Sequence, residues 1–172
     1  MKVYFAILAA LMPLSALAAG TAPPVKTKTS EDCTGSQIYD AESKTCVDSG
    51  DSRLNDAERI EGARELASFG RANDALRVLA TLEDPTTPDA LTLRGYATRK
   101  GGDFQAGVAF YHAAIKIDPE NWQARSYLAQ GLLEEGDRAG AEAQLCLIRA
   151  GGGRGTWPEI SLVQALGGDS TY

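Results

Sequence analysis

The sequence predicts an all-α fold, an α-solenoid of about three helix pairs followed by a C-terminal capping helix. Three observations predict it. A Gly-Asp pair recurs 34 residues apart, at Gly102-Asp103 and Gly136-Asp137; apolar residues recur at helical spacings from Asn55 onward; and glycine or proline follows each helical stretch. A period of about 34 residues is typical of two-helix units that stack. Stacked pairs leave an extended face and bring no reactive centre of their own, so we expect a docking surface.

The first 18 residues are predicted to be a secretory signal peptide. Lys2 precedes an apolar run from Val3 to Leu11, and Ala16-Leu17-Ala18 has the small-residue pattern of a cleavage site. The run is shorter than the roughly 20 residues that a membrane span needs. We therefore expect a periplasmic or secreted mature protein with no membrane insertion after signal cleavage.

Three short segments are expected between the signal peptide and the helices. Residues 19–32 contain Pro23-Pro24 and almost no bulky apolar side chain. They cannot bury enough surface to offset the entropy of ordering, so they are predicted to be a disordered arm. Residues 33–46 are predicted to form a small disulfide-stapled loop, and residues 47–54 a polar linker.

Two of the three cysteines, Cys33 and Cys46, are expected to pair. They are close in sequence and flanked by turn-forming residues, and disulfides persist in exported proteins. Closing a loop of this size stabilises its ordered form by about 3 kcal/mol on the chain-entropy model. Cys146 is then an odd thiol, which could link two copies of the chain into a dimer.

The repeat region is predicted over residues 55–150. Asn55 and Glu58 have the spacing of a capping box, so a first helix is predicted from there to Phe69. A second helix is predicted over 72–82, and Pro85 explains why it ends there.

The remaining helices have the same kinds of boundary residues. The third begins at Thr87 or Asp89 and stops at Gly101-Gly102, the fourth runs from Asp103 to before Pro119, the fifth from Asn121 to Gly136, and the sixth ends at a Gly-rich corner, 151–155. A capping helix is predicted over 156–167, with Thr156 and Glu159 as a second capping box, and residues 168–172 are a tail.

The order of these residues resembles the tetratricopeptide repeat. The resemblance covers Asn55 to Gly167; its best match spans Ala90 to Asn121, the third unit keeps much of the pattern, and the first unit is degenerate. It implies a right-handed solenoid in which the first helix of each unit lines a concave groove for a peptide or protein segment. The matching residues of the best unit are Gly95, Gly102-Asp103-Phe104, Tyr111, Ala114 and Asp118-Pro119.

Two residues depart from the family pattern. Arg94 stands where the family usually has a large apolar residue, and Gly107 replaces the usual alanine. A glycine inside a helix costs about 1 kcal/mol relative to alanine, so a looser middle unit is expected. The chain is also similar to small exported repeat proteins of alphaproteobacteria, in its two-cysteine loop ahead of the helices and in its Gly-Arg-Gly-Thr-Trp stretch over 153–157.

The resemblance places the candidate groove residues on the first helix of each unit. The cations among them could hold an acidic tail or a terminal carboxylate through charge-assisted hydrogen bonds. The alternative is a solvated helix face whose Arg and Lys offset nearby acids. We expect a non-enzymatic adaptor that binds an unidentified protein or peptide. The candidate residues are Arg64, Thr92, Tyr96, Arg99, Lys100, Gln123, Ser126 and Gln130.

Cell-wall glycan binding is a second candidate function, carried by the loop over 33–46 with the repeats as a spacer. The order of Cys, Gly, Tyr-Asp and Cys in this loop is distantly similar to part of the small disulfide modules that bind chitin-like glycans. Ile38 and Tyr39 would be the stacking residues. A stapled spacer is the plainer interpretation.

Composition argues against other classes. The net charge is −6, and an acidic surface repels phosphate backbones, so nucleic acid is not an expected partner. His112 is the only histidine and lies one repeat before Cys146; both are expected to be partly buried packing residues. Thiol chemistry at Cys146 is a third, less favoured hypothesis, and it requires an accessible thiolate of low pKa. With one histidine and two paired thiols, no metal site and no cofactor is expected.

Overall fold

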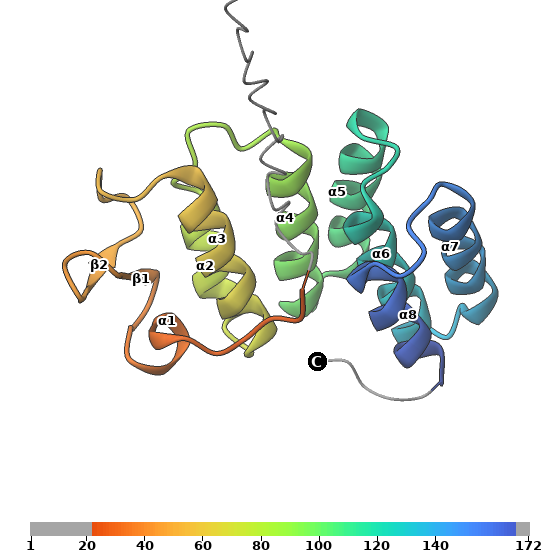
Figure 1. Ribbon diagram of the computed structural model, residues 1–172, viewed down its shortest axis with the longest axis horizontal. Coiled ribbons are helices and arrows are strands. Elements are labelled where there is room, and N and C mark those ends of the chain that lie inside the picture. The colour runs from red at the N-terminus through yellow and green to blue at the C-terminus, as the bar shows by residue number, and fades with distance from the viewer. Residues whose placement is uncertain (1–21, 168–172) are drawn as a thin grey trace, which may run out of the picture.

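The computed structural model describes residues 22–167, so the predicted signal peptide, the first residues of the arm and the C-terminal tail lie outside the described residues. The described part is mostly helical, with one small sheet (Figure 1). The predicted helices are found within a few residues of their expected bounds. Helices α2 to α8 span Asp56–Ser68, Ala72–Leu79, Pro88–Lys100, Phe104–Ile117, Trp122–Glu134, Arg138–Ala150 and Trp157–Gly167.

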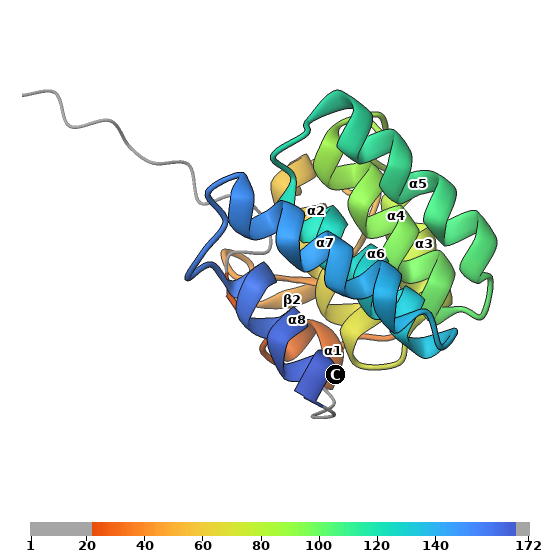
Figure 2. The same ribbon diagram turned by 90° about the vertical axis from the view of Figure 1, so that its right-hand side faces the viewer.

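The helices pack in chain order and form two rows. Helices α2, α4, α6 and α8 contact one another in succession, and we call them the even row. Helices α3, α5 and α7 pack against the even row. Figure 1 shows the helix pairs side by side, and Figure 2 looks along the rows. Short connections make such neighbouring helices antiparallel.

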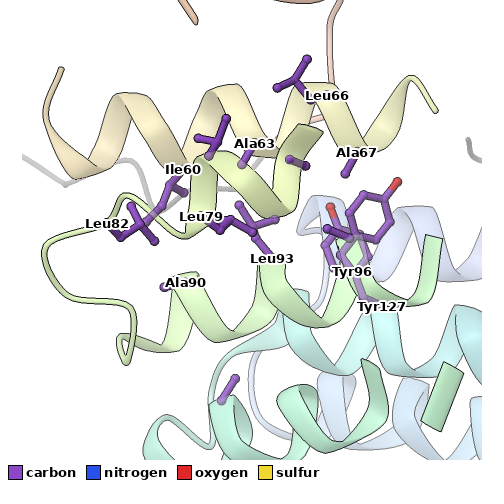
Figure 3. Packing of buried hydrophobic residues seen from close by; sticks show 14 of the residues in the cluster. Ile60, Ala63, Leu66, Ala67, Leu79, Leu82, Ala90, Leu93, Tyr96 and Tyr127 are labelled. Atoms are coloured by element: carbon purple, nitrogen blue, oxygen red, sulfur yellow. The ribbon is translucent and has the colours of Figure 1, made fainter. Parts of the chain in front are cut away.

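The core lies between the rows. One apolar cluster joins the residues ahead of α2 to α6, and a second joins α6 to α8. Figure 3 shows Ile60, Leu79 and Leu93, from three successive helices, gathered in the first cluster. Among the largest buried side chains are Tyr96 of α4 and Tyr127 of α6, whose rings stack with centroids 4.2 Å apart. Stacked aromatic pairs bury large apolar areas, so they hold α4 and α6 together.

The recurring Gly-Asp pair has two structural roles. Gly102 ends α4 with a positive φ of 102°, a conformation that favours glycine. The Asp103 amide then donates to the Thr98 carbonyl at 3.1 Å, which is the Schellman arrangement of a helix end. The Asp103 side chain caps the next helix by accepting the Ala106 amide. The same arrangement recurs at Gly136-Asp137, so the repeat seen in the sequence marks a helix stop and a helix start.

The predicted loop is a β-hairpin, so the all-α prediction is confirmed only in part. Strands β1 (Gln37–Asp40) and β2 (Thr45–Asp48) pair antiparallel, and β2 takes in the first residues of the predicted linker. The predicted disulfide between Cys33 and Cys46 is confirmed, with the two Cα atoms 5.6 Å apart. Ile38 is buried against α2, where a Cβ added to Gly62 would lie 3.0 Å from its side chain. The hairpin is therefore part of the apolar core.

Gly107 has a different role from the expected loosening of the middle unit. A Cβ built on it would lie 2.9 Å from the Gly95 carbonyl oxygen and 3.0 Å from the Arg99 Cβ. A Cβ on Gly95 would in turn lie 2.7 Å from the Tyr111 ring. The two glycines let α4 and α5 approach more closely than any larger residue would allow.

Candidate functional site

The predicted groove residues all lie on the even row. Arg64 belongs to α2, four of the residues to α4 and three to α6. They were expected to turn outward into an open groove, yet the structure buries every one except the half-buried Lys100. Their polar groups are therefore mostly engaged inside the molecule, and each needs a partner of its own.

The three cations of this set each have a carboxylate nearby. Arg99, only 5% exposed, pairs with Glu134 of α6, and its Nε donates to the Tyr111 hydroxyl at 3.4 Å. Burial alone would lower the pKa of Arg99, but Tyr111 and Glu134 raise it overall, so the group stays charged. Lys100 Nζ lies 3.9 Å from Glu134, and burial lowers the pKa of Lys100. Arg64 lies 3.3 Å from Glu61. Because these charges are compensated, the geometry gives little support to binding of an acidic tail.

Ser126 and Gln130 face the last helix. The Ser126 hydroxyl lies 3.2 Å from that of Ser161 in α8, and the Gln130 amide donates to both, at 3.2 and 3.4 Å. All three residues are buried. They fasten α8 to α6, which is a structural role. Ser161 was not among the predicted residues, although it lies 35 residues after Ser126, within one residue of the repeat period of 34.

Two of the predicted residues keep unfilled hydrogen-bonding capacity within residues 22–167. Both amide atoms of Gln123, Nε2 and Oε1, are buried with no hydrogen-bond partner, and so is Nε of Arg64. Thr92, by contrast, donates to the Pro88 carbonyl at 2.7 Å and accepts the Asn121 amide at 3.0 Å. A buried amide with neither bond made costs about 1–3 kcal/mol for each unsatisfied group. Among the predicted groove residues, Gln123 is therefore the one whose buried amide is not explained by hydrogen bonds within residues 22–167.

The predicted disordered arm is ordered where the structure describes it, over 22–32. Its residues Lys28–Glu31 form α1, and Glu65 of α2 holds the start of that helix. Glu65 accepts the Thr27 amide and hydroxyl, both at 2.7 Å, and the Ser30 amide at 2.9 Å. The arm was expected to be disordered because it has few apolar side chains. Instead, three hydrogen bonds to the buried Glu65 carboxylate stabilise its ordered conformation. Nothing in the local pattern of the arm indicates this, because Glu65 is distant in sequence.

The upstream end of the described arm reaches Arg64. The Arg64 guanidinium donates to the Ala22 carbonyl, and Lys26 Nζ lies 5.2 Å from the centre of the Phe69 ring. Figure 1 shows this segment leaving α1 and running across α2. Arm, hairpin and α2 line an open pocket of about 400 Å³. The site therefore contains a segment of extended chain that the sequence analysis had not placed there.

The two glycan-stacking candidates lie differently from one another. Ile38 is 4% exposed and belongs to the core cluster. Tyr39 is half-buried, with Lys28 Nζ 4.7 Å above its ring and within 3.2 Å of its hydroxyl. A stacking platform needs an uncovered ring face, so this geometry does not favour glycan binding.

His112 and Cys146 are both exposed, on α5 and α7, so the expectation of partly buried packing residues is wrong. Their repeat positions face away from the even row. In the part of the chain that the structure describes, there is no group of three His, Cys, Asp or Glu side chains that could hold a metal ion. None of the described helices combines the length and the apolar character that crossing a membrane requires.

Comparisons of this chain with protein-family models, with curated proteins and with solved structures found no match.

Proposed function

We propose that this chain is a non-enzymatic protein-binding module of the periplasm or the extracellular space. Its helix pairs form a right-handed solenoid of about three tetratricopeptide-like units, with α8 as the cap, and the even row binds an extended peptide segment. Within the even row, α2 contacts α4, α4 contacts α6 and α6 contacts α8. This order of contacts supports a solenoid of stacked helix pairs. An exported location is supported by the disulfide between Cys33 and Cys46.

The observation that carries the proposal is the buried amide of Gln123, which has no hydrogen-bond partner among residues 22–167. A primary amide has donors and an acceptor side by side, and one peptide unit of an extended chain offers the complementary acceptor and donor. Because both amide atoms are covered in the free chain, the Gln123 side chain would turn toward the groove on binding, and a bound peptide would then supply the two unmade hydrogen bonds. Because Gln123 would bind the backbone of the peptide, it would not select the peptide's sequence. Any sequence preference would come from the peptide side chains on either side of that backbone unit.

Arg64 supplies a second support, because it already donates to a backbone carbonyl, that of Ala22. Arg64 and Gln123 are on α2 and α6, two helix spacings apart. At about 8–10 Å for each spacing and about 3.3 Å for each extended residue, a peptide of roughly five or six residues would connect them.

The proposal is tested with peptides selected from a random display library on the chain lacking its predicted signal peptide. Their affinities are then measured by fluorescence anisotropy for the wild type, Gln123→Leu and the control Gln105→Leu, which changes an exposed glutamine of α5 in the same way. We expect at least a tenfold loss of affinity for Gln123→Leu and none for the control.

Stability measurements separate binding from folding in the same variants. Replacing an unpaired buried amide by an apolar group of similar shape should leave the free energy of unfolding unchanged or raise it by about 1 kcal/mol. A library that gives no binders, or binders with equal affinity for the wild type and Gln123→Leu, contradicts the proposal.

A further inference from the structure

We propose that the chain's own segment Ala22–Thr27 occupies the α2 end of this face, and that the partner is a basic, extended segment with a hydroxyl residue that binds there by displacing it. This inference rests on the proposed function in one respect only, that the even row binds peptides. Beyond the proposed function, we infer the chemistry of the partner and the identity of the segment that occupies the site in the free protein.

One end of the segment is held by Glu65. The Glu65 side chain is buried, with 8% of the residue exposed, and it accepts three hydrogen bonds from Thr27 and Ser30. Thr27 has an extended backbone, with φ −123° and ψ −175°, and it presents its amide and its hydroxyl to the two carboxylate oxygens. Any extended peptide with a threonine or serine at this point could present the same pair of donors. The Glu65 carboxylate is therefore a recognition element for a hydroxyl residue.

The other end is held by Arg64, which donates to the Ala22 carbonyl, while its Nε has no partner within the residues that the structure describes. Between the two ends the segment is mostly exposed, and Val25 keeps 69% of its surface accessible. Little apolar area is buried by the segment, so the two polar anchors supply most of its attachment. A competitor that satisfies the same anchors and buries more surface would replace it.

Charge decides the kind of competitor. From Ala22 to Ser30 the chain has Lys26 and Lys28 and no acidic residue, whereas the sequence as a whole carries a net charge of −6. The pocket that the segment, the hairpin and α2 line together includes three carboxylates, those of Glu58, Glu61 and Glu65, and among its described lining residues Arg64 is the one cation. The segment itself forms part of the pocket wall, and the volume of about 400 Å³ has room for a long side chain. A lysine or arginine of the partner would place its charge among these carboxylates.

The probe is a fluorescent peptide with the sequence of residues 20–31, added to the chain lacking its predicted signal peptide. Three receptors are compared: the wild type, Thr27→Val, which loosens the internal segment, and Thr34→Val, the same change at an exposed threonine whose hydroxyl donates to Gln37. We expect the peptide to bind Thr27→Val at least tenfold more tightly than the wild type or Thr34→Val, because less of the internal competitor must be displaced. Glu65→Gln should weaken binding to either background at least tenfold.

Two further measurements keep the inference open to contradiction. The peptide with both lysines replaced by glutamate should bind at least tenfold more weakly, and the Thr27 and Ser30 amides of the chain should exchange faster when the native peptide is bound. Equal affinity for all receptors, or equal affinity of the acidic peptide, overturns the inference. A concentration-dependent dimer of Thr27→Val in sedimentation also overturns it, since the segment would then belong on a second copy.

The failures of the two proposals are distinguishable. If library peptides depend on Gln123 but the arm peptide binds nowhere, the even row binds peptides and the arm is a fixed structural element. If the arm peptide binds through Glu65 and no library peptide depends on Gln123, the α2 site stands and the wider groove does not.

Discussion

At the scale of single residues, the middle of the molecule depends on two glycines that face each other. Gly95 and Gly107 bring the backbones of α4 and α5 so close that an added Cβ on either would fall within 3 Å of its neighbour. Helix propensity, which is a property of one residue, gives glycine a penalty at both positions. Packing favours glycine instead, because a Cβ at position 107 would press against the backbone oxygen of Gly95, which cannot move aside.

Gly107→Ala should therefore destabilise the protein by about 1–3 kcal/mol, although the substitution improves helix propensity. Urea unfolding followed by circular dichroism measures the change. The control is Ala143→Gly, an exposed position inside α7, which should cost about 1 kcal/mol through propensity alone. If Gly107→Ala is stabilising, the close approach of α4 and α5 does not exist in solution.

For the polar residues of the even row, the sequence predicted the helix on which each lies but not its burial or its partner. Their positions on α2, α4 and α6 follow from the repeat and were correctly assigned to helices. Their burial and pairing were not predictable, because partners such as Glu134 for Arg99 and Ser161 for Ser126 come from other repeats. The contacts depend on the angles between helices, which no local pattern specifies.

At the scale of elements, the last helix is attached differently from its prediction. Glu159 was expected to close a capping box with Thr156. Its carboxylate instead accepts the Gly155 amide at 2.7 Å and pairs with Arg149 of α7 at 2.6 Å. It therefore joins the start of α8 to the preceding helix. The hydrogen bond from Gly155, followed by the Arg149 interaction, lowers the pKa of Glu159 below its ordinary value of 4.5.

This lowered pKa predicts a pH-dependent contribution to stability. A carboxylate whose folded pKa is depressed stabilises the fold above its unfolded pKa, and the contribution is lost as pH falls through the lower folded value. Glu159→Gln should therefore cost about 1–2 kcal/mol at pH 7 and progressively less below pH 4.5. Unfolding by urea at pH 7 and in acid measures both values.

The control for this prediction is Glu142→Gln, which removes an exposed ion pair with Arg138. Exposed pairs contribute about 0–1 kcal/mol, so little change is expected at either pH. A cost for Glu159→Gln that stays the same in acid would mean that the ionised carboxylate does not hold α8.

At the scale of the whole molecule, the hairpin belongs to the same core as the helices. Ile38 and Val47, one from each strand, are buried in the cluster that extends to α6. Arg71, just ahead of α3, donates to the carbonyls of Cys33 and Gly35 at 2.9 and 2.7 Å. The disulfide therefore constrains a segment that shares the core of the helices, so we expect its loss to affect the whole domain.

Replacing Cys33 and Cys46 by alanine should lower the free energy of unfolding by about 3 kcal/mol while the native helical signal remains. Thermal unfolding by circular dichroism and amide exchange of residues 37–48 measure the change, with Cys146→Ala, an exposed thiol, as a control that should have no effect. An unchanged unfolding midpoint, with faster exchange confined to 37–48, would show that the hairpin is an independent unit.

The sequence by itself determined the helices from α2 to α8, their limits to within a few residues, the glycine-aspartate turns and the disulfide, because each depends on neighbours close along the chain. Only the tertiary structure decided that Glu65 holds the described part of the arm, that Ile38 enters the core and that Gln123 is buried with no partner in the described part of the chain. These features join segments that are distant in sequence, and their energies exist only once the helices have packed. That packing turns a row of helices into a face already partly occupied by its own chain.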